Sequence, residues 1–306
     1  MKFEIAGLSL QVILVNKKMD AKKSTWRRIL YFPLTKIIIG IIVCVGILSV
    51  GKIGVKRLLS FTSLNEEIKT LLGASVLAIL VLAGYITLYK FYEKRKINEL
   101  SEKGLAKNLI SGILLGAVLL SLTIYVIYLN HGFFIISVNS FIYILPGLGT
   151  AFAAAVSEEI LFRGIIFRIT EEKLGSYLAL AISALLFGAA HFANPNSTLL
   201  AALGIAVQAG LLLGAAYIYS KNLWLPIALH FAWDFTQAGI FGATSSGNII
   251  GKSLLTTKIE GPVLISGGPF GPEGSIQATV FCLIAAIILM ILNHRQNKIV
   301  KPYWVK

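Results

Sequence analysis

Three stretches of this 306-residue sequence place ionisable side chains inside long apolar runs. The first stretch carries two adjacent carboxylates and an arginine, and each of the other two carries a histidine. Glutamate and histidine are side chains that commonly activate water as general bases. Ionisable groups are costly inside a bilayer, so their presence there indicates function. The residues concerned are Glu158, Glu159, Arg163, His191, His230 and Asp234.

Helical spacing predicts which of these side chains share a face. Glu159 and Arg163 are four residues apart with the carboxylate first, which is the better orientation for an ion pair within a helix. His230 and Asp234 have the same spacing and share a face of another helix. Glu158 projects about 100° away from Glu159. We therefore interpret Glu159 and Arg163 as a structural ion pair and Glu158 as the candidate reactive carboxylate.

Simpler explanations exist for each residue alone. A single histidine in a membrane helix often only makes hydrogen bonds between helices. An arginine at such depth needs a partner whether or not the site is catalytic. Glu158, the two histidines and Asp234 are harder to explain together, although they could also form a proton relay or ion pathway.

Composition places these residues in a membrane protein. Hydrophobic residues make up 56% of the chain, charged residues 14%, and the mean hydropathy is +0.80. Residues 108–157 and 174–220 contain no Asp, Glu, Lys or Arg, and each run is long enough for two helices of about 20 apolar residues. The sequence predicts an all-α, polytopic transmembrane helical bundle and excludes a soluble enzyme, a fibre or a disordered chain.

We expect eight spanning helices, with seven as the alternative, and the functional residues lie in the fourth, fifth and seventh. An N-terminal membrane-anchoring region is expected over 1–107, with two spans and basic cytoplasmic segments. The catalytic core is expected over 108–293, and a basic cytoplasmic tail over 294–306. The expected spans are centred in 33–51, 70–90, 108–128, 146–168, 176–193, 199–219, 223–242 and 275–293.

The net charge of +14 comes from basic clusters that flank the apolar runs. This positive-inside pattern predicts that both termini are cytoplasmic and that 243–274, rich in Gly and Pro, is an external loop. Anionic lipid headgroups, and not nucleic acid, are the expected partner of the basic clusters. Cys44 and Cys282 cannot build a disulfide framework. The stretch 1–15 is not expected to be a signal peptide.

Three short motifs in these segments resemble a known family. Glu158-Glu-Ile-Leu-Phe-Arg163 resembles E-E-x-x-x-R, Phe187-Gly-Ala-Ala-His191 resembles F-x-x-x-H, and His230-Phe-Ala-Trp-Asp234 resembles H-x-x-x-N/D. In this order they are similar to the signature blocks of the CPBP family of intramembrane proteases, which contains CAAX prenyl endopeptidases and bacteriocin-processing or self-immunity proteins. The resemblance covers 146–242, and the stretch 267–275 is similar to one in bacterial members.

Other protease types and nucleotide binding are excluded. The zinc motif H-E-x-x-H, the rhomboid pattern G-x-S-G and the presenilin pattern G-x-G-D do not occur. The stretch 246–253 is not a P-loop, because Ser246 replaces its first glycine.

The resemblance implies a hydrolase with defined residue roles. Glu158 would be the general base and His191 would orient the water. His230 with Asp234 would face the oxyanion, while Glu159 and Arg163 would hold their helix in place. An alternative is a metallo-endopeptidase with zinc bound by Glu158, His191 and His230 and with Glu159 as base. The metal-free glutamate mechanism is preferred.

Asp234 departs from the family pattern, because many members carry Asn there. An Asn amide can donate a hydrogen bond to an oxyanion, whereas an ionised carboxylate only accepts. Either Asp234 is protonated and its O–H donates, or it is ionised and holds His230 as a donating imidazolium. The i,i+4 spacing favours the second explanation.

A membrane-embedded peptide or a lipid-anchored protein is the expected substrate. The Lys- and Ile-rich composition favours a bacterial plasma membrane, where prenylated substrates are not generally expected. The resemblance also implies a role in bacteriocin processing or self-immunity. The competing classes are a non-proteolytic immunity or scaffold protein and a proton or ion translocator.

Overall fold

The computed structural model describes residues 25–249 and 251–305, and the expectations for residues 1–24 lie outside this range. Long apolar helices make up most of the structure, which confirms the all-α polytopic bundle. Among the described residues, six helical runs are long and apolar enough to cross a membrane. They are α2 (Pro33–Ser60), α3 (Glu66–Tyr92), α4 (Leu105–Leu129), Phe141–His191, Leu199–Ser220 and α11 (Ile276–Arg295).

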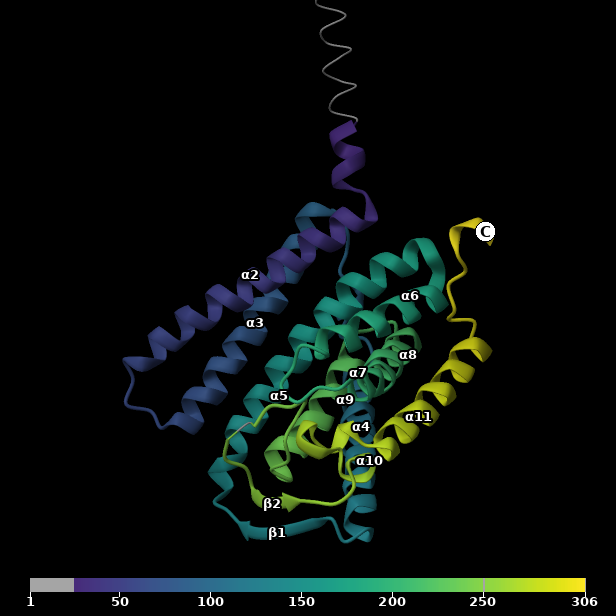
Figure 1. Cartoon of the computed structure of the whole chain (residues 1–306). Helices are drawn as coiled ribbons and strands as arrows, with labels where there is room; N and C mark the ends of the chain where they lie inside the picture. The colour runs from purple at the N-terminus through teal and green to yellow at the C-terminus, as the bar shows by residue number, and fades with distance from the viewer. Residues whose placement is uncertain (1–24, 250, 306) are drawn as a thin grey trace, which may run out of the picture.

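The fourth and fifth expected spans form one continuous helical run. It comprises η2 (Phe141–Tyr143), α5 (Ile144–Glu159), the π-helical η3 (Ile160–Phe167) and α6 (Arg168–His191). The run turns back at Gly175, whose φ of 76° and ψ of 171° are not helical (Figure 1). The seventh expected span corresponds to α9 (Trp224–Asp234) and the π-helical η5 (Phe235–Ile240), which are shorter than the other runs. The count of eight crossings stays a prediction.

The connections gather at two opposite ends of the bundle (Figure 1). We call 93–104, 168–175, 221–223 and 295–305 the charged face, and 61–65, 130–143, 192–198 and 241–275 the loop face. The charged face includes the 3-10 helices η1 (Asn98–Leu100) and η8 (Tyr303–Val305). On the loop face, β1 (Phe133–Val138) pairs antiparallel with β2 (Leu255–Ile259). The same face carries the short helices α10 (Val263–Ser266), η6 (Gly268–Phe270) and η7 (Pro272–Gly274).

Two glycines bring the helices that carry the histidines close to their neighbours. A Cβ atom on Gly116 of α4 would lie 2.3 Å from the carbonyl oxygen of Leu229, so α4 and α9 are in backbone contact. A Cβ atom on Gly210 would lie 2.6 Å from the Cα atom of Ala184 in α6. Gly210 belongs to the π-helical η4 (Ala206–Leu211), which lies between α7 (Leu199–Ile205) and α8 (Leu212–Ser220). Small residues at helix interfaces permit such approaches in membranes.

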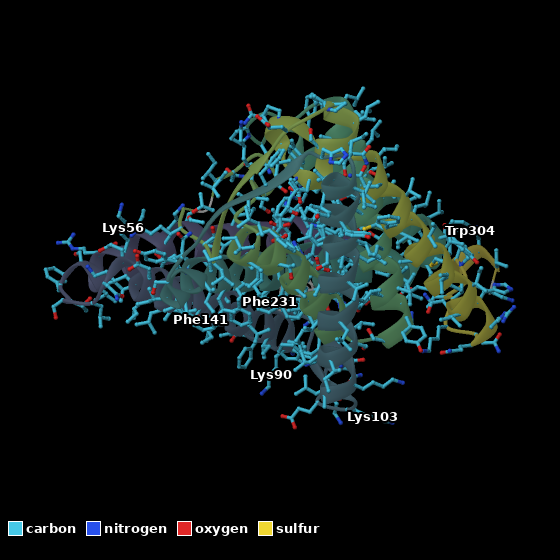
Figure 2. The ribbon with its side chains drawn as sticks, turned by 90° about the horizontal axis from the view of Figure 1, so that it is seen from below. Lys56, Lys90, Lys103, Phe141, Phe231 and Trp304 are labelled. Carbon is cyan, nitrogen blue, oxygen red and sulfur yellow. The ribbon has the colours of Figure 1, made fainter. Side chains whose placement is uncertain are left out.

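The outer surface of the bundle is apolar, as expected of helices that face lipid. Ile42 and Ile53 of α2, Val118 of α4 and Ile288 of α11 are all exposed. Figure 2 shows side chains covering the outside of the bundle, with Lys56 and Lys103 at its periphery. This surface supports a multi-pass membrane protein.

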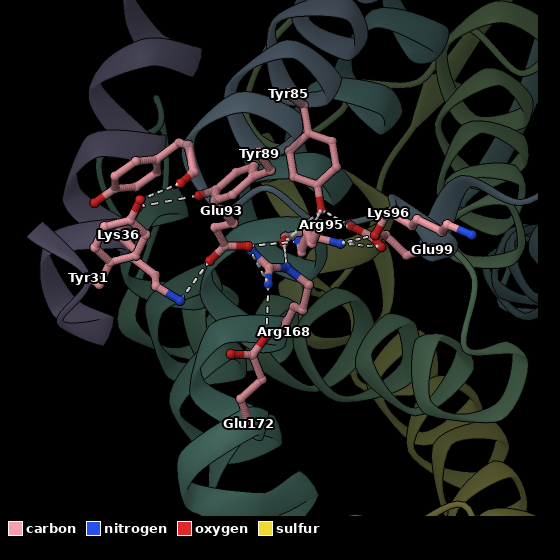
Figure 3. Close-up of polar contacts among 12 residues, drawn as sticks. Tyr31, Lys36, Tyr85, Tyr89, Glu93, Arg95, Lys96, Glu99, Arg168 and Glu172 are labelled. Atoms are coloured by element: carbon pink, nitrogen blue, oxygen red, sulfur yellow. Dashed lines mark hydrogen bonds and ion pairs between the residues drawn. The ribbon is translucent and has the colours of Figure 1, made fainter.

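An ionic network on the charged face joins the N-terminal helices to the core (Figure 3). Glu93, just after the end of α3, accepts a hydrogen bond from Arg95 at 2.7 Å and forms ion pairs with Lys36 at 2.8 Å and with Arg168 at 3.1 Å. Burial opposes ionisation, but the charge of Arg168 and the hydrogen bonds from Lys36 and Arg95 hold the pKa of Glu93 below its ordinary value. Tyr85 of α3 also donates to the carbonyl of Gly164 in η3 at 3.0 Å. The first two long helices are therefore tied to the segment that carries the candidate site.

Candidate active site

Three helical segments bring the six ionisable residues together. Glu158 and Glu159 end α5, and Arg163 follows in η3. His191 ends α6, while His230 and Asp234 lie in the second half of α9. Cluster contacts run between residues as far apart as 71 positions in sequence.

Glu159 connects Arg163 to His230. Its Oε1 atom accepts from Nη1 of Arg163 at 2.8 Å and lies 3.0 Å from Nδ1 of His230. The side chains of Glu159 and Arg163 are fully buried. The spacing in sequence indicated only that Glu159 pairs with Arg163. The structure shows that Glu159 also contacts the imidazole ring of His230.

The guanidinium of Arg163 is held from a second side by η4. Its Nη2 atom donates to the carbonyl of Ala209 and, at 3.3 Å, to that of Gly210. Both Arg163 and these carbonyls belong to π-helical segments. Such segments are rare and are frequent at functional sites. The network therefore fixes Glu159 as well as Arg163.

His230 faces a carboxylate with each ring nitrogen. Nδ1 faces Glu159, and Nε2 lies 3.5 Å from Oδ2 of Asp234, one helical turn away. Both nitrogens can donate at once only when the ring is an imidazolium. This geometry supports the explanation in which an ionised Asp234 accompanies a donating His230.

Glu158 and His191 form a looser pair. Nε2 of His191 lies 3.8 Å from Oε2 of Glu158, which is too long for a direct hydrogen bond. Nδ1 of His191 lies 2.9 Å from the carbonyl of Phe187, so the proton of a neutral ring is assigned to Nδ1 and the Nε2 lone pair faces Glu158. Oε2 of Glu158 has no hydrogen-bond partner among the described residues. The gap suits a bridging water molecule.

The ring of Phe187 contacts both histidines. Its ring stacks on His191 with centroids 4.6 Å apart, and it contacts His230 edge-on at 6.2 Å. The guanidinium of Arg163 lies 4.9 Å from its centroid. The ring therefore packs against three members of the cluster.

A cavity of about 420 Å³ opens onto the cluster. Its polar lining includes Glu158, His191, His230, Asp234, Thr150 and Asn194. A second cavity of about 40 Å³ reaches both histidines and Asp234, and is also lined by Gln208 and Glu273. The smaller cavity has room for about one water molecule.

Glu273 and Gln208 are site residues that sequence reasoning missed. Glu273 is buried and accepts from the backbone N–H of Ser246. Gln208 donates to the carbonyl of Glu273 at 2.8 Å, while its Oε1 atom is buried without a partner among the described residues. Burial and, secondarily, the charge of Asp234 raise the pKa of the Glu273 carboxyl to about 7. The only signal in the sequence was that Glu273 is the single acid in the stretch 267–275.

The alternative zinc set, Glu158, His191 and His230, does not form a metal-binding group in this arrangement. Among the described residues, no group of three or more His, Cys, Asp or Glu side chains is placed to hold a metal ion. The ring of Phe187 contacts both histidines, His191 faces Glu158, and His230 faces Asp234. No catalytic step is therefore assigned to a metal.

Comparison with known proteins identifies the segment that holds these motifs. Residues 139–236, about a third of the chain, match the family model for type II CAAX prenyl endopeptidase Rce1-like proteins. The matched segment contains all three motifs and every predicted site residue. No curated protein and no solved structure matches the chain. The family resemblance carried by the three motifs is thereby confirmed for this segment.

Proposed function

Since residues 139–236 form an Rce1-like domain of the CPBP family, we propose that this chain is an intramembrane endopeptidase that hydrolyses membrane-embedded or lipid-anchored peptides. One observation carries the proposal most directly. A carboxylate oxygen of Glu158 lies 3.8 Å from a histidine nitrogen at the wall of the larger cavity, and it has no hydrogen-bond partner among the residues that the structure describes. That arrangement suits the activation of one water molecule.

Glu158 and His191 act on the attacking water. The water donates one proton to Glu158 and is oriented by Nε2 of His191. Its oxygen forms a bond to the carbonyl carbon, and the carbonyl electrons move onto oxygen. Glu158 then gives the proton to the leaving nitrogen as the C–N bond breaks. General acid–base catalysis of this kind contributes about 10²–10⁴ in rate.

His230 stabilises the developing oxyanion. Glu159 holds the Nδ1 side of the ring, so the Nε2 side faces Asp234 and the cavity. A donor fixed before the reaction stabilises the transition state without reorganisation. Asp234, as an ionised acceptor, would act through the charge of His230 and not by donating to the oxyanion itself.

The reaction is proposed to proceed without a metal. The observation in support is the donor arrangement, in which Glu158, His191 and His230 do not converge on one point. A bacterial plasma membrane with cytoplasmic termini is the proposed location, and processing of a bacteriocin-like peptide is one use that fits such a site.

The test is hydrolysis of a fluorogenic peptide library by the reconstituted protein beside Glu158→Gln. We expect cleavage by the native chain and none by the variant. Peptide binding without cleavage by the native chain would favour an immunity or scaffold role. Proton flux in proteoliposomes that disappears in Glu158→Gln would favour a translocator.

A further inference from the structure

We propose that the active site opens to the non-cytoplasmic side of the membrane, so that its substrate is a peptide whose scissile bond lies at the outer leaflet. The assignment of a substrate rests on the proposed function. The sidedness itself rests on the distribution of charge and on the lining of the cavity.

The two faces of the bundle differ in charge. On the charged face and the helix ends that adjoin it, basic residues outnumber acidic ones in 27–36, 90–107 and 294–301, whereas 168–173 is balanced. On the loop face, bases and acids are nearly balanced in 56–69 and 252–273. Basic residues remain in the cytoplasm when membrane helices insert, so the charged face is assigned to the cytoplasm.

His191 lies at the end of α6 that meets the loop face. It is the last residue of the helix, and residues 192–198 follow directly. The stretch from Gly175, on the charged face, to His191 spans about 24 Å of helix. Figure 1 shows α6 near the C-terminal end of the bundle, with β1 and β2 at the opposite end.

The cavity continues from Glu158 toward the same face. Thr150, Ala154 and Glu158 follow one another at i,i+4 steps on α5 and all line it. The remaining wall includes Asn194 and Asn248, which belong to the loop face. These steps lead toward the N-terminal end of α5, which also lies at the loop face.

Packed side chains fill the route toward the charged face. Phe167 and Tyr217 make an edge-to-face contact with centroids 5.4 Å apart, and both are buried. Arg163, four residues before Phe167 in η3, is also fully buried. Beyond them, Glu93 and Arg168 close the surface in the network of Figure 3. Access from the cytoplasm would require these contacts to break.

The chemistry of the rim indicates the form of the substrate. Asn194 and Asn248 offer amide donors and acceptors beside an apolar wall that includes Leu161 and Phe162. An extended peptide suits this rim, because its backbone groups can pair with the two amides while its apolar side chains pack against the apolar wall. A soluble peptide on the cytoplasmic side would not reach this rim.

Cysteine accessibility tests the sidedness without requiring activity. All variants are made in the full chain with Cys44→Ala and Cys282→Ala, so that no native thiol reacts with the reagent. Both native cysteines are buried. Single cysteines replace Thr150, Ala154 and Asn248 along the cavity, and Lys103→Cys is the control on the charged face. Intact cells are treated with a membrane-impermeant thiol reagent, with and without permeabilisation.

We expect labelling at 248 and at 150 or 154 in intact cells, and labelling at 103 only after permeabilisation. Labelling of 150 and 154 only after permeabilisation would overturn the inference. Labelling at 248 alone would also overturn it, because the cavity would then be closed on that side. Labelling at 103 from outside would show the opposite orientation.

Two membrane-anchored reporters test the assignment of the substrate. Both carry one cleavable sequence selected from the peptide library, placed outside the membrane in one and inside in the other. We expect cleavage of the outer reporter only, and none by Glu158→Gln. Cleavage of the inner reporter would overturn the inference and leave the protease function standing. Cleavage of neither, with labelling as expected, would count against the protease function and leave the sidedness standing.

Discussion

Nδ1 of His230 lies 3.0 Å from Oε1 of Glu159, the same oxygen that accepts from Arg163 at 2.8 Å. The ion pair that appears structural from its spacing therefore also orients the ring assigned to the oxyanion. Loss of Arg163 should affect both folding and the position of that ring.

Removal of Arg163 should damage folding more than removal of the whole pair. Arg163→Leu leaves Glu159 buried with one cation fewer, and breaking a buried pair costs about 3–5 kcal/mol. The double change Glu159→Leu/Arg163→Leu should give a higher folded yield, measured by size-exclusion chromatography in detergent. The double variant should still be inactive, because His230 loses the partner of its Nδ1. Equal yields for the single and double variants would refute the pair. Glu172, which is half-exposed and pairs with Arg168, provides the control. Glu172→Leu should lower the free energy of unfolding by less than about 1 kcal/mol.

Asp234→Asn should retain activity, because an amide can donate where an imidazolium did. We expect kcat/KM within about tenfold of the native value, or about 1.4 kcal/mol. Asp234→Leu should lose more, because it removes the charged partner of His230 and supplies no amide donor in its place. A fully inactive Asp234→Asn variant would contradict the role assigned to this position.

Glu273 should make stability depend on pH near neutrality. Its pKa in the folded chain is about 7, above the ordinary value of 4.5. The carboxyl therefore contributes stability that is fully present below about pH 4.5 and is lost as pH rises through about 7, up to about 3 kcal/mol. Thermal unfolding in detergent should show Tm falling between pH 5 and 8, and Glu273→Gln should flatten that fall. The exposed Glu260 serves as the control, since Glu260→Gln should keep the native slope. An unchanged slope in Glu273→Gln would contradict the assignment.

Removal of metal ions should leave activity intact. We expect a zinc chelator to change kcat/KM less than twofold, and elemental analysis of the purified chain to find well below one zinc per chain. One zinc per chain, together with activity that chelation abolishes and zinc restores, would instead support binding by Glu158, His191 and His230.

Local spacing predicted much of the site, and long-range packing supplied the rest. Within one helix, the pairs Glu159–Arg163 and His230–Asp234 follow from the period of 3.6 residues. The contact between Glu159 and His230 spans 71 residues, and no periodicity relates positions in different helices. Glu273 was equally hidden, because a Gly-rich loop has no pattern that shows where it packs.

The fold shows the same division between local and long-range information. Uncharged runs predicted the bundle, because a bilayer selects apolar helices. The pairing of β1 with β2 joins segments on either side of the matched domain. Neither segment shows a clear alternation of apolar and polar residues that would have predicted it. The N-terminal helices were expected only to anchor the chain, yet Lys36 and Glu93 connect them to Arg168 in the core. That connection depends on three segments meeting at one face.

The single-turnover rate of peptide cleavage by Glu158→Gln tests the central claim most directly. Gln keeps the shape of Glu158 but cannot accept a proton from water. The account predicts a loss of at least about 10²-fold in rate, with folded yield and peptide binding unchanged. Glu172→Gln, on the half-exposed carboxylate of the charged face, is the matched control and should cleave at the native rate. Cleavage by Glu158→Gln within a few-fold of the native rate would contradict the account.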